Sequence, residues 1–323
     1  MLNKTRVLIV TPYLADANNG NWRTAHRWRQ LLRRQYRVDV VSAIDRAATH
    51  SQPDVVIALH ARRSHAAILQ SKSLMPAVPL IVVLTGTDLY RDIAESAEAQ
   101  QSLQLADALI VLQDDAIRHV PGMHRHKTHV VFQSANPLLP AVKPKGKLSA
   151  VVVGHLRSEK SPETIFRAAT LLAHEPRIHI THIGESLDTA LADEARALNH
   201  THTNYHWVGM LPHGLTRAAI KRAHVLLHPS IMEGGANVII EAITSGTPVI
   251  ASKMSGNIGM LGTDYAGYFP VGDAAALAAL LKKCLDEPNT LIRLTTACKA
   301  RSQLLTPAEE TRRLETIINQ LIE

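Results

Sequence analysis

Two glutamates, Glu233 and Glu241, stand eight positions apart on either side of a glycine-containing turn. Gly234 and Gly235 allow the backbone to approach a ligand closely. A helix that begins here would present free N–H groups and a partial positive charge to an anion. Asn237 suits the first turn of that helix, and Glu241 would lie about one turn inside it, within reach of ribose hydroxyls. The pattern indicates a site for a phosphorylated ligand with a ribose, and the alternative is a plain glycine-rich turn with two surface glutamates.

A cationic segment follows the apolar run that ends at Val153. Gly154 leads into it, and Arg157 and Lys160 stand three positions apart where the chain enters the next expected helix. Both cations can face a diphosphate there, because arginine offers paired contacts and lysine a point charge. The alternative is a solvated basic loop.

In the first half of the chain, basic residues follow the apolar run Val55–Leu59. His60, Arg62 and Arg63 come directly after it. In a parallel sheet these residues would stand at the carboxyl end of a strand, where ligands bind. The group therefore predicts an anion site, and the alternative is a solvated cluster of charges.

Two more loops in the first half follow apolar runs in the same way. Gly20, Asn21 and Arg23 belong to a glycine-containing loop that enters a helix and suits a sugar or its phosphates. Thr85 and Asp88 follow the fourth apolar run. A simple βα turn is the alternative for the first loop, and a capped helix start for the second.

Short runs rich in Val and Ile alternate with amphipathic stretches along the chain. The runs are Arg6–Val10, Val38–Ser42, Val55–Leu59, Leu80–Leu84, Ala108–Leu112, His129–Phe132, Ala150–Val153, His179–Ile183, His206–Val208, Val225–His228, Val249–Ala251 and Tyr268–Phe269. Helical patterns cover Trp22–Tyr36, Pro162–Ala173, Thr189–Asn199, Leu215–Ala223, Ala236–Ser245, Ala274–Leu285 and Pro307–Ile322. Such alternation predicts βαβ units and parallel sheets buried on both faces.

A stretch rich in Pro and Lys, residues 140–147, interrupts this alternation and indicates a linker. The length of 323 residues suits two domains. We therefore expect an α/β protein with two Rossmann-like, doubly wound parallel-sheet domains that face each other across a cleft. Their expected bounds are 1–143 and 144–306, and the last helix, 307–323, is expected to pack back on the first domain.

The composition limits the partners. A net charge of +7 suits anionic ligands, but the charges are scattered and aromatic residues make up only 4%, so we expect no nucleic-acid partner. The first apolar run is too short for a signal sequence or a membrane span, and two cysteines make no disulfide framework. We expect a cytoplasmic protein without a membrane partner. No histidine pair has a convincing metal-binding spacing, so most of the histidines should be surface or satisfied core residues.

Taken in order, residues 150–273 resemble the donor-binding domain of retaining glycosyltransferases of the GT-B fold, in the family that includes sucrose and glycogen synthase-like enzymes. The resemblance implies that Arg157 and Lys160 bind the diphosphate of a UDP-sugar, that Glu241 holds its ribose, and that Glu233 contacts the sugar. Catalytic roles fall on Glu233, Arg157 and Lys160. Further donor contacts fall on Gly20, Gly154, Gly184, Met210, Gly234, Gly235, Ala236 and Asn237. In such enzymes cations and a helix N-terminus replace a metal ion at the leaving diphosphate, so the UDP-sugar is a co-substrate and no cofactor is implied.

Four segments narrow the resemblance to the selenosugar synthases of bacterial selenoneine biosynthesis, nearly end to end. They are Thr85–Asp92, His60–Ser64, Glu233–Val238 and Gly267–Asp273. This resemblance implies transfer of N-acetylglucosamine from UDP-N-acetylglucosamine to selenophosphate, then loss of phosphate to leave a 1-selenosugar for downstream selenoneine enzymes. The implied acceptor-binding residues are Asn21, Arg23, His60, Arg62, Arg63, Thr85 and Asp88.

One departure from the GT-B pattern concerns the general base. Relatives often carry a catalytic-site histidine where this chain has Thr85–Asp88, so that role does not transfer. Selenium is a strong nucleophile at neutral pH, which makes a dedicated base less necessary. Two other functions fit the same residues: a UDP-sugar-dependent enzyme acting on a lipid or polysaccharide hydroxyl, and a nucleotide-sugar-binding protein without turnover.

Overall fold

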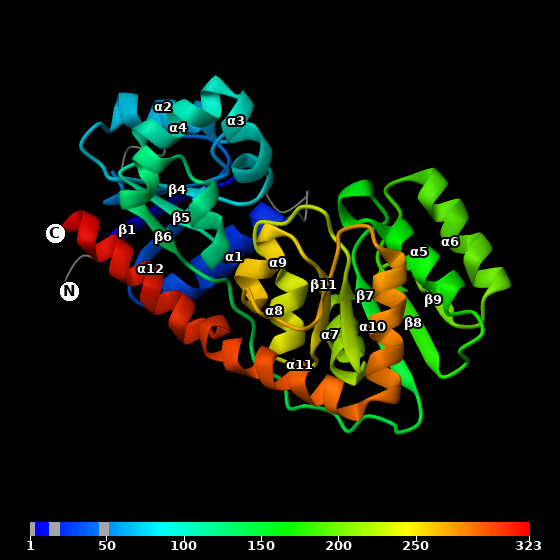
Figure 1. Ribbon diagram of the computed structural model, residues 1–323. Helices are drawn as coiled ribbons and strands as arrows, with labels where there is room; N and C mark the ends of the chain where they lie inside the picture. The colour runs from blue at the N-terminus through cyan, green and yellow to red at the C-terminus, as the bar shows by residue number, and fades with distance from the viewer. Residues whose placement is uncertain (1–3, 13–19, 45–51) are drawn as a thin grey trace. The chain divides into compact units, whose positions relative to one another are not determined.

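The computed structural model describes residues 4–12, 20–44 and 52–323, and the chain forms two compact units (Figure 1). One unit consists of residues 1–133 and 307–323, and the other of residues 134–306. Each contains a sheet of six parallel strands with helices packed against it. The expected α/β class with parallel sheets is confirmed.

The sheet of the first unit has the order β2-β1-β3-β4-β5-β6. Its strands are β1 (Arg6–Val10), β2 (Arg37–Val41), β3 (Val55–Leu59), β4 (Leu80–Leu84), β5 (Ala108–Val111) and β6 (Thr128–Val130). Its helices are α1 (Gly20–Leu32), α2 (His65–Leu74), α3 (Ile93–Glu95), α4 (Ala97–Leu105) and α12 (Pro307–Ile322), with a π-helical turn η2 (Asp88–Asp92) and 3-10 turns η3 (Asp114–His119) and η4 (Gly122–Lys127).

Alternate residues of these strands enter two separate hydrophobic layers. Val7 and Ile9 of β1 pack in one layer with Trp28 of α1 and Ile317 of α12. Leu8 and Val10, on the opposite face, pack in the other layer with residues of α2 and α4. Helix α12, red in Figure 1, lies beside α1 although nearly the whole chain separates them in sequence. The first sheet is therefore buried on both faces, as its apolar strands predict.

The sheet of the second unit has the order β12-β11-β10-β7-β8-β9. Its strands are β7 (Leu148–Val153), β8 (Ile178–Ile183), β9 (Tyr205–Trp207), β10 (Val225–His228), β11 (Val249–Ser252) and β12 (Tyr268–Phe269). Its helices are α5 (Pro162–Leu171), α6 (Thr189–Thr201), α7 (His213–Arg222), α8 (Asn237–Ile243), α9 (Ser255–Leu261), α10 (Ala274–Asp286) and α11 (Pro288–Arg301), with 3-10 turns η5 (Ser158–Lys160) and η6 (Ser302–Leu305).

Residues 134–143 belong to the second unit, so the boundary lies earlier than the one expected at residue 143. The Leu138 amide donates to the Thr244 carbonyl over 2.9 Å. Pro140 lies against Gly246, where an added Cβ would stand 2.8 Å from the proline ring. Gly246 also has a φ of +73°, which favours glycine. The segment interpreted as a linker thus belongs to the second unit, held there by the Leu138 hydrogen bond just before it and by the Pro140 ring packed on Gly246.

Within the described residues, no helix is both long and apolar enough to cross a membrane.

Candidate active site

In the second unit, β7 and β10 are parallel neighbours, with Val225 opposite Ala150 and Leu227 opposite Val152. Their carboxyl ends therefore meet at the same edge of the sheet. The loop after β7 carries Gly154 to Lys160, and the loop after β10 carries Pro229 to Ala236. The Ile231 amide donates to the Glu159 carbonyl over 3.0 Å. This bond ties the two loops together.

Glu233 and Lys160 form an ion pair at this edge, through Oε1 and Nζ. The Ser230 hydroxyl donates to the same oxygen over 3.1 Å. Burial alone would raise the pKa of Glu233, but the Lys160 charge and the hydrogen bonds from Lys160 and Ser230 outweigh burial and hold this pKa below its ordinary value. The structure thus brings together two residues that the sequence places 73 positions apart, and it makes Glu233 a carboxylate at neutral pH.

Arg157, the third residue with a predicted catalytic role, is more open. Its side chain is about half exposed, and Nε lies 3.9 Å from the Glu159 carboxylate. Its carbonyl accepts from the Lys160 amide over 3.0 Å, which closes the η5 turn. Arg157 and Lys160 therefore leave the same short turn, one exposed and one held on Glu233.

His228, the last residue of β10, is a member of this cluster that the sequence patterns did not single out. Its side chain is only 2% exposed, and Nε2 lies 3.7 Å from Glu233 Oε1. Burial lowers the pKa of His228 to about 4, against the opposing effect of Glu233 and with the help of Lys160. The imidazole is therefore neutral at neutral pH.

Gly256 was also missed. It stands at the start of α9, and an added Cβ would come within 2.1 Å of the Glu233 carbonyl oxygen. Only glycine allows the α9 backbone to lie this close to the loop. A signal was present, since Ser255-Gly256 follows an apolar run as the other glycine loops do, but α9 itself had not been predicted.

Glu241 lies in α8, one turn beyond Asn237, and its side chain is 14% exposed. Its Oε1 is 2.7 Å from Nε2 of His213, an exposed residue at the start of α7. Ala236, Gly234 and Gly235 precede the helix, and Ala236 is buried. The seven-residue α8 is shorter than the helix expected over 236–245.

The predicted donor-side glycines lie on neighbouring loops. Gly184 follows β8 and lies on the Gly154 backbone, because an added Cβ would stand 1.9 Å from the Gly154 carbonyl oxygen. Trp207 Nε1 donates to the Gly184 carbonyl over 2.8 Å. The Gly184 amide donates to the Gly209 carbonyl, so Met210, which is exposed, follows directly on this contact. The ends of β7, β8 and β9 are thus joined through glycine backbones.

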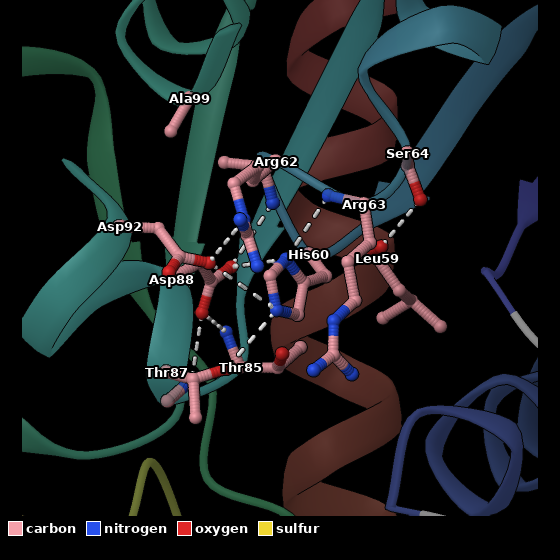
Figure 2. A network of polar contacts seen from close by, with 12 residues as sticks. Leu59, His60, Arg62, Arg63, Ser64, Thr85, Thr87, Asp88, Asp92 and Ala99 are labelled. Carbon is pink, nitrogen blue, oxygen red and sulfur yellow. Dashed lines mark hydrogen bonds and ion pairs between the residues drawn. The ribbon is translucent and has the colours of Figure 1, made fainter. Parts of the chain in front are cut away.

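In the first unit, His60 and Asp88 form the centre of a buried polar network at the ends of β3 and β4 (Figure 2). Asp88 Oδ1 accepts from the amides of Thr85 and Gly86 over 2.9 and 2.8 Å. Its Oδ2 accepts from the Ala61 amide over 3.0 Å. Asp88 therefore uses both oxygens to hold the two loops to each other.

His60 is buried in the left-handed region, with a φ of +74°. Such a backbone costs energy in a non-glycine residue and persists only where its surroundings fix it. Here Nε2 lies 3.1 Å from the Thr87 hydroxyl, and Nδ1 accepts from the Arg63 amide over 3.3 Å. Burial lowers the pKa of His60, opposed by Asp88. Both ring nitrogens of His60 thus contact groups of the two loops, and the imidazole is buried from solvent.

Arg62 and Arg63 turn differently from His60 (Figure 2). Arg62 Nε donates to Asp92 Oδ2 over 2.9 Å, yet its side chain is 41% exposed. Arg91 Nε lies 3.3 Å from the other oxygen of Asp92. Arg63 is exposed, and its guanidinium points toward the Thr85 side of the network. The two arginines therefore lie on different sides of the network: Arg62 pairs with Asp92, and Arg63 is directed toward the Thr85 side.

The other predicted acceptor loop is described only in part. Asn18 and Asn19 lie outside the described residues. Gly20, Asn21 and Arg23 form the first turn of α1, with Asn21 buried and Arg23 exposed. Within the described ranges, no group of three or more His, Cys, Asp or Glu side chains is arranged to hold a metal ion, and the expectation of a metal-independent site stays a prediction.

Comparison with known proteins agrees with this architecture. The D-inositol 3-phosphate glycosyltransferase of Streptomyces griseus is 26% identical over 280 residues, which cover 77% of this chain and 58% of the relative. The chain thus spans less than two thirds of that relative's length. Sucrose-phosphate synthase from Thermosynechococcus elongatus matches 98% of this chain and 99% of its own at a TM-score of 0.79 and 17% identity. Anabaena HepE, in complex with UDP and glucose, matches 98% of this chain and 100% of its own at a TM-score of 0.74 and 14% identity.

The two six-stranded parallel sheets, each with its surrounding helices, match GT-B glycosyltransferase structures. The family profile "Glycosyl transferases group 1" matches residues 140–301, which is half of the chain. This region contains the ion pair of Lys160 with Glu233, the Glu241 carboxylate and the glycine contacts described above. The chain belongs to the glycosyl transferases of group 1.

Proposed function

We propose that the protein is a glycosyltransferase that takes its sugar from a UDP-sugar bound by the second unit. The observation that carries this proposal is the cluster of Lys160, Glu233 and Ser230 where β7 and β10 end. Glu241 lies in α8, the helix that follows the Glu233 loop. A cation, a carboxylate for sugar hydroxyls and a carboxylate for the ribose match the three parts of such a donor. The complex of HepE with UDP and glucose supports this assignment by analogy.

The reaction breaks the bond between the anomeric carbon and the diphosphate oxygen, and negative charge grows on the leaving UDP. Lys160 and Arg157 stabilise that charge as point charge and paired donor. Glu233, held ionised by its neighbours, accepts hydrogen bonds from sugar hydroxyls. Glu241 accepts from the ribose through the oxygen that His213 leaves open. In this assignment no metal ion is needed.

We propose selenophosphate as the acceptor and N-acetylglucosamine as the sugar. Selenium attacks the anomeric carbon and UDP leaves. Water then cleaves the selenium–phosphorus bond, which gives phosphate and the 1-selenosugar. The exposed Arg63 guanidinium on the Thr85 side, and the partly exposed Arg62 beside Asp92, support a small, highly charged acceptor. His60 and Asp88 hold the loop that carries these arginines, and Asn21 and Arg23 lie in the first turn of α1, the helix that follows strand β1 along the chain.

The test is an anaerobic incubation of the purified protein with UDP-N-acetylglucosamine and selenophosphate, without added metal, followed by mass spectrometry. UDP together with a selenium-containing hexosamine is the expected result. UDP without a selenosugar would leave the donor site in place but refute the acceptor, and a lipid or polysaccharide hydroxyl would then replace it. UDP-sugar binding without any UDP release over a panel of acceptors would refute the enzyme in favour of a binding protein.

A further inference from the structure

His228 has a buried nitrogen without a partner. Its Nε2 makes no hydrogen bond to any described residue, although the side chain is almost fully buried at the end of β10. The nitrogen faces Glu233 Oε1 at 3.7 Å, which is too far for a hydrogen bond. Most buried polar atoms in proteins are satisfied, so each exception requires a reason.

The hydrogen bonds of the Glu233 carboxylate explain why His228 Nε2 has no partner. Lys160 Nζ and Ser230 Oγ already occupy Glu233 Oε1. His228 is the third polar group directed at this one oxygen, and the described part of the chain sends no hydrogen bond to Oε2. The charged groups that face His228 are Lys160, from the loop after β7, and Glu233, from the loop after β10. His228 is therefore a third potential donor to this oxygen, after Lys160 and Ser230.

Donor binding gives Lys160 a second partner, a step that rests on the function proposed above. An ammonium group that moves onto a diphosphate weakens its pairing with Glu233. A largely buried carboxylate that has lost its cation and keeps only the Ser230 hydroxyl is disfavoured, and it would take up a proton or turn away. Glu233 must stay ionised and fixed if it is to accept from the sugar.

We propose that His228 is a positioning residue that takes over Glu233 Oε1 when Lys160 moves onto the diphosphate of the donor. The neutral imidazole donates from Nε2, and a shift of under an ångström closes the present gap to an ordinary hydrogen bond, at about 2.9–3.2 Å. Glu233 then keeps its charge and its orientation while Lys160 serves the leaving group.

The inference predicts an effect confined to ligands that carry the diphosphate. Affinities of UDP and of uridine are measured by calorimetry or competition for the wild type, for His228→Leu and for His228→Gln. We expect His228→Leu to weaken UDP by roughly tenfold or more, the effect of a lost hydrogen bond to a charged group, and to leave uridine unchanged. His228→Gln, which keeps a donor near the position of Nε2, should restore UDP affinity to within about threefold.

The effect of His228→Leu is also measured in a Glu233→Gln variant, which tests whether His228 acts through the Glu233 charge. A neutral amide needs no replacement for Lys160, so adding His228→Leu to Glu233→Gln should leave UDP affinity unchanged. His224→Leu, at the residue directly before the opposite end of β10, is the matched control for the loss of a buried histidine. It should change thermal stability without changing the ratio of UDP to uridine affinity.

Four results would overturn the inference. Equal weakening of UDP and uridine by His228→Leu would mean a general disturbance of the site. An undiminished effect of His228→Leu in the Glu233→Gln background would mean that His228 does not act through Glu233. Wild-type affinity for UDP in His228→Leu would refute the role of His228 alone, whereas a wild type that binds neither UDP nor a UDP-sugar would refute the proposed function as well.

Discussion

Gly256 lies against the backbone of Glu233 so closely that a Cβ at position 256 would stand 2.1 Å from the Glu233 carbonyl oxygen and 3.2 Å from its Cβ. The first residues of α9 therefore pack directly under the loop that carries Glu233. The position of the Glu233 carboxylate depends on a residue that carries no functional group.

We expect Gly256→Ala to lower kcat/KM for UDP release by about 100-fold, since a shift of about 1 Å at a reacting group has an effect of this size. The loop must move, because backbone atoms surround the new methyl group. Gly214→Ala is the control: nothing lies within 4 Å of its Cβ position in α7, and alanine should slightly stabilise that helix. Full activity in Gly256→Ala would show that the loop position is not critical.

Glu241 should act on the ribose and on nothing else. We expect Glu241→Ala to weaken UDP by about tenfold or more, because hydrogen bonds between hydroxyls and a carboxylate are lost. The affinity for 2′,3′-dideoxy-UDP, which lacks those hydroxyls, should change little. The measurement is competition against a fluorescent UDP-sugar. Equal losses for both nucleotides would assign Glu241 to the structure of α8.

Arg63 should act on the acceptor. Arg63→Ala is expected to raise the KM for selenophosphate by about tenfold through loss of a charge-assisted contact, with the KM for UDP-N-acetylglucosamine unchanged. Arg29→Ala, another exposed arginine of the same unit, on α1, controls for the loss of positive charge as such. An unchanged selenophosphate KM in Arg63→Ala would remove this residue from the acceptor site.

Because His182 and His228 are buried, we expect the protein to lose stability as the pH falls below about 6.5. Burial lowers the pKa of each to about 4 in the folded state, while the unfolded value is about 6.5. The unfolded chain therefore binds more protons between these two values. The free energy of unfolding is at its full value above about pH 6.5 and decreases by about 1.4 kcal/mol per pH unit for each histidine as the pH falls toward 4.

Urea unfolding at pH 7, 6 and 5 measures this slope. His182→Phe should remove the share of one histidine, while lowering stability at pH 7 through loss of the bonds to Tyr205 and Gly154. A variant that keeps the full slope would show that His182 is protonated equally in both states.

The strands were predictable from sequence because parallel strands covered on both faces are continuous apolar runs. β1, β3, β4 and β10 have the predicted bounds, and α12 begins and ends where its pattern does. Helices α2, α3, α4, α9 and α11 were not predicted. Three of the first four residues of α9 are glycine or small polar residues, and helix propensity gives no signal there.

Parts of the site that consist of residues close in sequence could be predicted. Contacts between residues far apart in sequence could not. The spacing of Glu233 and Glu241 is visible in sequence, but the pairing of Glu233 with Lys160 arises from the adjacency of β7 and β10. His228 reads as the end of an apolar run. Similarly, the sequence could not show that both Asp88 oxygens accept hydrogen bonds from backbone amides, because these bonds require the ends of β3 and β4 to lie side by side.

The pairing of α12 with α1 has a consequence for synthesis on the ribosome. Trp28 Nε1 donates to the buried Glu310 carboxylate over 2.6 Å, so residues near the far end of the chain cover the first sheet. The ribosome makes this sheet early, but makes α12 only after the whole second unit, residues 134–306. At about 5–20 residues per second, that takes roughly ten seconds or more. During this interval the apolar face around Trp28 is uncovered. The nascent chain is then most dependent on chaperones, although the first unit contains most of its strands and helices already.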